Sequence, residues 1–295
     1  MTEFKSGFAA VVGRPNVGKS TLMNTVLGQK IAIATDKAQT TRRRIKGIYT
    51  NEEGQIVFID TPGIHKPLDK LGEFLMDEAK FSIPDADVIL FIVDGSEPAG
   101  AGDKWIVKNV LSETKTPIII VLNKVDKIKD QLKREANLLT YKTLFEENLP
   151  TVKVSAQTGR NIDTLISAIM RKLPEGAPIY PEDELTDETM RSIAQEVIRE
   201  KILVNTKDEI PHSVAVVIEK YEEKENIDRI FAKIHVEHDS QKGILIGKSG
   251  QMLKKIGTQA RLELEKMLDK KVYLELNVKV SKEWRKKSKN LEDWV

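Results

Sequence analysis

Residues 13–21 read GRPNVGKST, and the tripeptide GKS occurs again in GILIGKSG (243–250). In the first stretch four residues separate Gly13 from the following GKS. This spacing lets successive backbone N–H groups surround a phosphate while the lysine reaches its oxygens. In the second stretch only three residues separate Gly243 from its GKS. The apolar run FAAVV (8–12) precedes the first stretch and TLMNTVL follows it, which is typical of a strand, a loop and a helix. The first stretch therefore predicts a phosphate-binding loop, or P-loop, and the second needs another explanation.

The composition is that of a globular chain with room for one or two domains. It has 295 residues, of which 40% are hydrophobic and 31% charged, and no cysteine. The lack of cysteine excludes disulfides, thiolate metal sites and cysteine nucleophiles, and it fits a reducing compartment. The N-terminus has too short an apolar run for a secretory signal, and no stretch approaches the length that spans a bilayer. We therefore expect any membrane contact to be peripheral.

Charge is distributed unevenly along the chain. The formal net charge is +2, but residues 241–295 alone hold 14 Lys and Arg against 7 Asp and Glu. A basic C-terminal region suggests a polyanionic partner. Charge alone favours the simpler interpretation, a solvated, lysine-rich surface.

Short apolar runs alternate with helical patterns up to about residue 173. Several runs, such as VILFIVD and PIIIVLNK, are almost wholly apolar, as in strands buried on both faces of a parallel sheet. The segment YTNEEGQIVF predicts a hairpin and an antiparallel edge. The alternation predicts a doubly wound α/β sheet. We expect strands at 8–12, 45–50, 55–60, 87–94, 118–123 and 152–155, and helices at 19–28, 72–82, 102–113, 130–147 and 161–172.

Three further polar motifs follow predicted strands, at the edge where such sheets bind ligands. DTPG (60–63) offers Asp60 to hold Mg²⁺ through water and the Gly63 N–H to touch a γ-phosphate. NKVD (123–126) ends in an aspartate whose carboxylate can accept both N–H donors of guanine, a pair that adenine lacks. SAQTG (155–159) would aim a backbone N–H at guanine O6.

Each motif by itself has a simpler interpretation, for example that Asp126 only caps a helix. Their order, each at a strand end, predicts GTP binding instead. Within NKVD, Asn123 would brace the loop and approach the purine N7, and the Lys124 stem would cover the base.

This pattern resembles the translation-factor-like P-loop GTPases. The polar stretch ATDKAQTTRRRI (34–45) would be switch I, in which Thr40 or Thr41 binds Mg²⁺; the sequence does not choose, and the resemblance favours Thr41. The resemblance assigns Mg²⁺ to Ser20, Thr41 and Asp60, and catalytic roles to Lys19, Thr41 and Asn16. The nucleotide-binding residues that the motifs and the resemblance together predict are Gly13, Arg14, Pro15, Asn16, Val17, Gly18, Lys19, Ser20, Thr21, Asp60, Gly63, Asn123, Lys124, Asp126, Ser155 and Ala156.

One position departs from the Ras-like pattern. Ras-type enzymes follow DTPG with a glutamine that orients the attacking water, whereas this chain has Ile64 and then His65. His65 could replace the glutamine or be an ordinary surface residue. In related GTPases without the glutamine, an asparagine equivalent to Asn16 helps to hold K⁺ beside the phosphates. The resemblance therefore implies slow, K⁺-assisted hydrolysis of GTP to GDP that a partner accelerates.

The segment LPEGAPIYPEDELTDE (173–188) contains three prolines and a cluster of acids, which marks a domain boundary. We predict a GTPase domain over 1–174, a linker over 175–186 and a second domain over 187–295. In the second domain a helix begins near Asp187 and two strands follow, SVAVVIEKYEE and DRIFAKIHVEHD. His235 and His238 are three residues apart on a strand and point to opposite faces, so they do not suggest a metal site.

The second GKS lies in a helix–turn–helix pattern that precedes a final strand. This order of elements, with Gly-Lys-Ser-Gly in the turn, resembles an α+β KH module of the second (type II) topology. In such modules a G-x-x-G turn lets a nucleic-acid backbone approach, and the adjacent helix N-terminus offers N–H groups to phosphate. The alternative is a glycine cap between two packed helices. The predicted RNA-binding residues are Ile246, Gly247, Lys248, Ser249, Gly250 and Lys254.

A P-loop GTPase with GRPNVGKS, QTTRR, DTPG and NKVD, joined to a KH module with GKSG, resembles the Era family over nearly the whole chain. The resemblance implies a monomeric cytoplasmic GTPase that uses Mg²⁺. It also implies binding near the 3′ end of 16S ribosomal RNA, help in assembly of the 30S subunit and peripheral association with the inner membrane face.

Rival interpretations are weaker. A tRNA-modifying relative would need a C-terminal cysteine, and a double-domain GTPase would need a second P-loop. An ATP-dependent kinase would lack NKVD. An RNA-binding module whose nucleotide domain is only structural is opposed by the intact Lys19, Ser20, Asp60 and Asp126.

Overall fold

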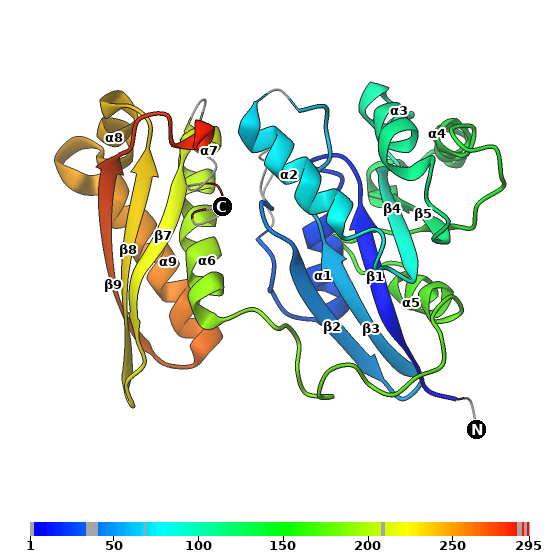
Figure 1. The fold of residues 1–295 in the computed structure, drawn as a ribbon, viewed down its shortest axis with the longest axis horizontal. Coiled ribbons are helices and arrows are strands. Elements are labelled where there is room, and N and C mark those ends of the chain that lie inside the picture. Colours follow the sequence, from blue (N-terminus) through cyan, green and yellow to red (C-terminus); the bar gives the residue numbers. More distant parts are fainter. Residues whose placement is uncertain are drawn as a thin grey trace. The chain divides into compact units, whose positions relative to one another are not determined.

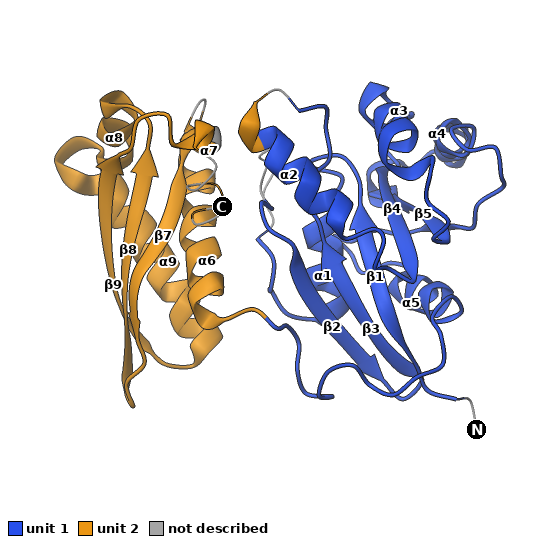
Figure 2. Ribbon diagram, in the orientation of Figure 1, with its two compact units in different colours: residues 1–68, 72–187 blue, residues 69–71, 188–295 orange. Residues whose placement is uncertain are grey.

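The computed structural model describes residues 3–33, 41–67, 69–207, 210–287, 291 and 294. The chain divides into two compact units, which we call the first unit (residues 1–68 and 72–187) and the second unit (residues 69–71 and 188–295) (Figure 2). Within the described ranges, every helix is too short or too polar to traverse a lipid bilayer.

Six strands form the sheet of the first unit, in the order β2-β3-β1-β4-β5-β6 (Figure 1). All neighbours pair in parallel except β2, which pairs antiparallel with β3 through the predicted hairpin. This arrangement confirms the predicted doubly wound sheet. The strands are β1 (Lys5–Val12), β2 (Ile45–Asn51), β3 (Gly54–Asp60), β4 (Val88–Asp94), β5 (Ile118–Asn123) and β6 (Thr151–Lys153).

The central strands are apolar because both faces of the sheet are covered. Along β4, Leu90 and Ile92 belong to one buried cluster, whereas Phe91 and Val93 belong to another. Side chains alternate between faces along a strand, so a continuous apolar run supplies both clusters. The first cluster is completed by α1 (Lys19–Leu27) and α5 (Ile162–Met170), and the second by α2 (Lys70–Phe81), α3 (Ala101–Ile106) and α4 (Gln131–Lys142).

Two predicted helices differ in length from those observed. The helix expected over 102–113 begins as α3 and continues as a π-helical segment, Val107–Leu111. The helix expected to reach residue 147 ends as α4 at Lys142, and the chain then tightens into turns. Phe145, just beyond that end, packs edge-on against Phe91 with ring centroids 5.9 Å apart. The apolar residues after Lys142 thus face the core without extending the helix.

The proline-rich segment after α5 packs along the sheet edge of the first unit. The Gln55 carboxamide oxygen accepts hydrogen bonds from the backbone N–H groups of Ile179 (2.8 Å) and Tyr180 (2.9 Å). The Ile48 N–H donates to the Leu185 carbonyl over 2.9 Å. Lys46 forms an ion pair with Asp187 at 2.6 Å. This segment is therefore attached to β2 and β3, and the compact units divide after Asp187; the composition-based boundaries remain a prediction.

The second unit has a three-stranded sheet in the order β7-β8-β9, with β7 and β8 antiparallel and β8 and β9 parallel. Buried Ile198 of α6, Ile234 of β8 and Ile256 of α9 belong to its core cluster. The order of elements confirms the predicted α+β arrangement. The bounds are α6 (Met190–Asn205), α7 (Ile210–Ser213), β7 (Ala215–Glu222), β8 (Ile227–Val236), α8 (Asp239–Ile246), α9 (Gln251–Leu268) and β9 (Lys271–Val280).

His235 of β8 lies in a polar–aromatic cluster near the C-terminus. Its ring stacks on Trp294 with centroids 3.9 Å apart, and its Nδ1 lies 2.9 Å from the Ser281 hydroxyl. Only 5% of the residue is exposed. Burial, reinforced by nearby Lys233 and Lys279, lowers the pKa of the His235 imidazole to about 4.

His235 should make the second unit acid-sensitive. Below the ordinary imidazole pKa of about 6.5, His235 binds a proton in the unfolded chain but stays neutral in the folded chain. The contribution of His235 to the free energy of unfolding is therefore fully present above that pH and is lost toward pH 4. The free energy of unfolding should be about 2 kcal/mol lower at pH 5 than at pH 7. Urea unfolding can be followed by Trp fluorescence in a Trp105→Phe background, which leaves Trp284 and Trp294 as reporters. His235→Gln should flatten this pH dependence, whereas His238→Gln, at an exposed position, should leave it intact. Equal pH profiles for wild type and His235→Gln would contradict the assignment.

Candidate functional site

The P-loop connects β1 to α1 in a conformation that requires glycine. Gly18 has a φ of 95° and directly precedes α1. A Cβ atom at this position would lie 2.4 Å from the Asn123 side-chain nitrogen, so any other residue would displace Asn123 and strain the backbone. That nitrogen donates to the Val17 carbonyl over 2.9 Å. The loop after β5 is thereby fastened to the loop after β1, as the sequence predicted for Asn123.

Lys19 is folded back into this loop. Its ammonium donates to the carbonyls of Gly13 (3.1 Å) and Arg14 (3.0 Å), and the residue is 6% exposed. Burial lowers the pKa of the Lys19 ammonium to about 8, although the charge of Asp60 acts in the opposite direction. A phosphate beside Lys19 would add negative charge and favour its protonated form.

Three oxygen-bearing side chains from three separate segments meet beside the P-loop. The Ser20 hydroxyl donates to Asp60 Oδ2 over 2.7 Å and lies 3.0 Å from the Thr41 hydroxyl, which is 3.3 Å from the same carboxylate oxygen. Burial raises the pKa of the Asp60 carboxyl, while Lys19 and the two hydroxyls oppose that shift. These are the residues that the sequence predicted for Mg²⁺. Thr40 and the rest of switch I up to it (34–40) lie outside the described residues.

The two carboxylate oxygens of Asp60 differ in their hydrogen bonding. The residue is fully buried, yet its Oδ1 has no hydrogen-bond partner in the described part of the chain. A buried carboxylate oxygen without a partner is costly unless something else satisfies it. Hydroxyl and carboxylate oxygens are the ligands that Mg²⁺ prefers, so this cluster fits that ion.

The DTPG loop packs directly on the P-loop. The Ile64 N–H donates to the Gly13 carbonyl over 3.1 Å, and a Cβ atom on Gly63 would lie 2.8 Å from Pro15 Cα. Ile64 is 1% exposed and belongs to the hydrophobic core of the first unit. The His65 Nδ1 lies 2.9 Å from the neighbouring Lys66 carbonyl. A catalytic role for His65 stays a prediction.

The loops after β5 and β6 meet at Asn123. Its side-chain oxygen accepts from the Ala156 N–H over 2.9 Å, so the N–H that the sequence assigned to guanine O6 has an internal partner here. Ser155 is fully buried and accepts from the Thr158 N–H. Asp126, by contrast, is exposed, and its carboxylate forms no hydrogen bond or ion pair with the described residues. It is thus free to accept from a ligand.

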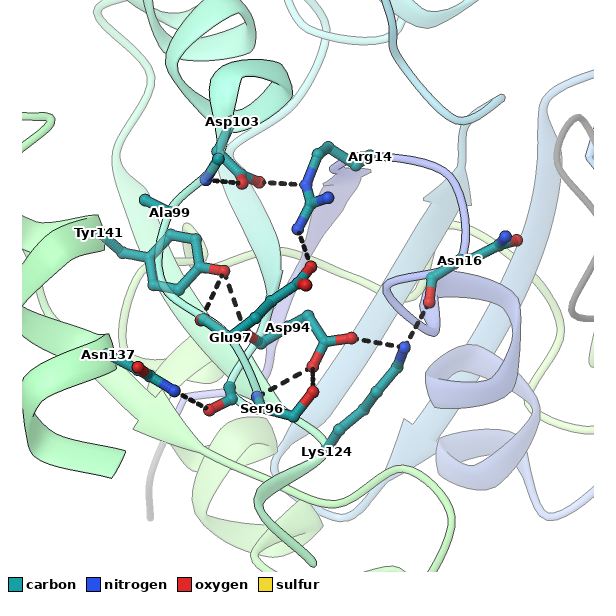
Figure 3. A network of polar contacts seen from close by, with 12 residues as sticks. Arg14, Asn16, Asp94, Ser96, Glu97, Ala99, Asp103, Lys124, Asn137 and Tyr141 are labelled. Carbon is teal, nitrogen blue, oxygen red and sulfur yellow. Dashed lines mark hydrogen bonds and ion pairs between the residues drawn. The ribbon is translucent and has the colours of Figure 1, made fainter. Parts of the chain in front are cut away.

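Lys124 links the loop after β5 to two neighbours. Its ammonium contacts Asp94 Oδ2 at 2.7 Å and the Asn16 carbonyl at 2.5 Å (Figure 3). The sequence analysis missed Asp94, although its position at the end of the strand VILFIVD was a signal that could have indicated it. Asp94 is 8% exposed, and its pKa lies below the ordinary range, because hydrogen bonds from Lys124 and Ser96 outweigh its burial.

The second GKS forms a tight turn between α8 and α9. Gly247 has a φ of 69°, Ser249 of 52° and Gly250 of 78°, which are conformations that favour glycine at the two outer positions. The Gly247 N–H donates to the Gly243 carbonyl over 2.9 Å. A Cβ atom on Gly247 would lie 2.7 Å from the Met252 Cβ. The turn therefore depends on its glycines for its shape.

The side chains around this turn are presented to solvent. Lys248, Ser249 and Lys254 are exposed and form no ion pair or side-chain hydrogen bond with the described residues. Ile244, one turn earlier on α8, is 54% exposed and was missed by the sequence analysis. An exposed apolar side chain beside unpaired lysines is a surface that can contact both the base and the backbone of a nucleic acid.

The fold and the two sites define a P-loop GTPase joined to a KH domain. The sequence matches the family described as a 50S ribosome-binding GTPase over residues 8–124 and the KH domain family over residues 209–285. The GTPase Era of Carboxydothermus hydrogenoformans is 50% identical over 289 residues, which cover 96% of this chain and 95% of that protein. The chain belongs to the Era family of GTPases, which confirms the resemblance drawn from the motifs.

Solved structures agree over the whole chain. A variant of Aquifex aeolicus Era bound to GDP and AlF4⁻ has a TM-score of 0.95 and 41% identity, with 99% of each chain covered. Era in complex with MgGDPNP and nucleotides 1506–1542 of 16S ribosomal RNA also has a TM-score of 0.95 and 41% identity, with 99% of this chain and 98% of that chain covered.

Proposed function

We propose that this chain is a GTP-driven switch that binds single-stranded RNA near the 3′ end of 16S ribosomal RNA and assists assembly of the 30S subunit. The observation that carries the proposal is the combination, in one chain, of the Ser20–Thr41–Asp60 cluster and the exposed GKSG turn. The RNA and the GTP analogue in the complex of a 41% identical relative support it.

The predicted nucleotide residues have complementary roles in this proposal. The P-loop residues from Gly13 to Thr21, with Gly63, would surround the phosphates, and Lys19 would neutralise them. Ser20, Thr41 and Asp60 would hold Mg²⁺, which neutralises charge that develops on the phosphates during transfer. Asn123, Lys124, Asp126, Ser155 and Ala156 would form the guanine site.

The RNA would bind the second unit at the turn that links α8 and α9. Gly247 and Gly250 leave space for a nucleic-acid backbone, and the neighbouring lysines attract its phosphates. We propose that the protein is a monomer in the cytoplasm, where its ribosomal partner is assembled, and that it associates peripherally with the inner membrane face.

Asn16 would help to hold K⁺ beside the phosphates. Its exposed side chain lies on the P-loop, away from the contact that its own carbonyl makes with Lys124 (Figure 3). A monovalent cation at this position would stabilise negative charge in the transition state, the task that an arginine serves in other GTPases.

Replacing K⁺ by Na⁺ should slow GTP hydrolysis about tenfold while GTP affinity changes little. Asn16→Ala should abolish this difference, because the cation would lose a ligand. Asn148→Ala, an exposed asparagine elsewhere in the first unit, serves as the control. Steady-state phosphate release in both salts measures the effect. Equal wild-type rates in the two salts would eliminate the role of Asn16 and favour His65 instead.

A further inference from the structure

A second set of contacts holds the P-loop from the loop that follows β4. The Arg14 guanidinium donates from Nε to Asp103 Oδ1 over 2.8 Å and from its terminal nitrogen to Glu97 Oε1 over 2.6 Å (Figure 3). The Arg14 side chain is thus engaged by two carboxylates. A contribution of this side chain to nucleotide binding would therefore be indirect, whereas the Arg14 backbone remains part of the P-loop.

Asp103 is built into the fold at this point. It is fully buried, and its second oxygen accepts from the Gly100 N–H over 2.9 Å. A Cβ atom on Gly102 would lie 2.7 Å from Arg14 Cδ, so the helix approaches the arginine closely. A buried carboxylate strongly favours its cationic partner, because removing that partner leaves an uncompensated charge.

The segment that carries these carboxylates, from the loop after β4 into α3, is itself held in place. The Tyr141 hydroxyl donates to the carbonyls of Asp94 (3.0 Å) and Glu97 (3.2 Å), and the Asn137 side chain donates to the Gly95 carbonyl over 3.0 Å. Both residues belong to α4, which packs in the same core cluster as α3. The segment that carries Glu97 and Asp103 is therefore held in position by α4.

Arg14 connects this segment to the phosphate site through its own backbone carbonyl. Its carbonyl accepts from the Lys19 ammonium over 3.0 Å, so the residue that the carboxylates hold also positions the P-loop lysine. Two residues further on, the Asn16 carbonyl accepts from Lys124, which is paired with Asp94. The end of β4 and the segment that follows it thus brace the P-loop at two points.

We infer that Asp103 and Glu97 are positioning residues that keep the P-loop in its nucleotide-binding shape through Arg14. We call these three residues the Arg14 clamp. An empty P-loop points several N–H groups at one point, an arrangement that an anion stabilises and that tends to relax without it. By holding the loop open the clamp reduces the ordering that nucleotide binding must otherwise drive. This inference rests on the proposed nucleotide site.

The clamp is tested by replacing Arg14 and its buried partner Asp103 with neutral, hydrogen-bonding side chains. The double variant Arg14→Gln/Asp103→Asn removes both charges together, so neither is left unpaired. We expect its Kd for GDP and for GTP, and its KM, to rise about tenfold, as when the competent loop falls to a tenth of the population. Its kcat should stay within about twofold of wild type, because the braced loop has the same role in ground and transition states.

Two further variants sharpen the test. Arg14→Lys can reach one carboxylate at a time and should raise both Kd values about threefold. Arg171→Gln, an exposed arginine outside the site, should raise neither. Melting temperatures of the nucleotide-free variants separate loss of fold from loss of loop order, since a merely structural pair would lower the melting temperature and leave Kd unchanged.

Wild-type Kd values for GDP and GTP in the double variant would overturn the clamp, and so would a fall in kcat with KM unaltered. If the double variant does not fold, Glu97→Gln decides, because that side chain is 52% exposed and its loss does not threaten the core. It should raise both Kd values about threefold, and no change would count against the clamp. A wild-type chain that binds neither GDP nor GTP would contradict the proposed nucleotide site itself.

Discussion

Asp126→Asn is expected to weaken GTP binding by about 2–4 kcal/mol and to shift the base preference toward xanthine. The exposed Asp126 carboxylate forms no hydrogen bond or ion pair with the described residues, so its two oxygens are available to both N–H donors of guanine. An asparagine presents one acceptor and one donor, which matches xanthine better. Titration with fluorescent GTP and XTP analogues measures both effects.

Asp85→Asn, an exposed aspartate outside the site, is the matched control and should bind GTP normally. A variant Asp126→Asn chain that keeps wild-type GTP affinity and gains nothing for XTP would show that the guanine assignment is wrong. The free carboxylate would then be an ordinary surface group.

The double variant Lys248→Asp/Ser249→Asp should lower RNA affinity about a hundredfold or more, since it reverses the charge where phosphates pass. Gly247 and Gly250 keep the turn in shape, and neither replaced side chain has a partner in the described residues. Intrinsic GTP hydrolysis and the melting temperature should therefore stay close to wild type. Residual RNA binding should depend less on salt, because fewer counterions are released.

Lys266→Asp, an exposed lysine at the far end of α9, controls for charge alone. The assay is titration of labelled single-stranded RNA from the 3′ end of 16S ribosomal RNA at two salt concentrations. Unchanged affinity in the double variant would mean that GKSG is only a helix turn. The RNA site would then have to be sought in the basic segment that begins at Ser281.

The parts that the sequence predicted correctly depend on local patterns. Short, almost wholly apolar runs indicated the strands. The ends of these runs indicated the ligand-binding loops, because parallel strands place their carboxyl ends at one edge of the sheet. Asn123 illustrates the success: its position at the end of β5 implied a brace, and its side chain contacts the carbonyl of Val17 and the N–H of Ala156.

The parts that escaped prediction depend on long-range pairing. Arg14 lies 83 residues before Glu97 and 89 before Asp103, and no periodicity or spacing connects it to them. The attachment of the proline-rich segment depends on the buried Gln55, a polar residue that directly precedes the apolar run of β3. Such contacts arise only when the sheet brings its edges and loops together.

The measurement that tests the account most directly is GTP turnover by the full chain in K⁺ buffer with Mg²⁺, with and without single-stranded RNA from the 3′ end of 16S ribosomal RNA. The account predicts slow turnover by the free protein, faster turnover with the RNA, and no acceleration in the Lys248→Asp/Ser249→Asp variant. If the RNA bound but left turnover unchanged, the nucleotide site and the RNA site would not belong to one switch. If no GTP were hydrolysed under either condition, the nucleotide domain would be purely structural and the central claim would fail.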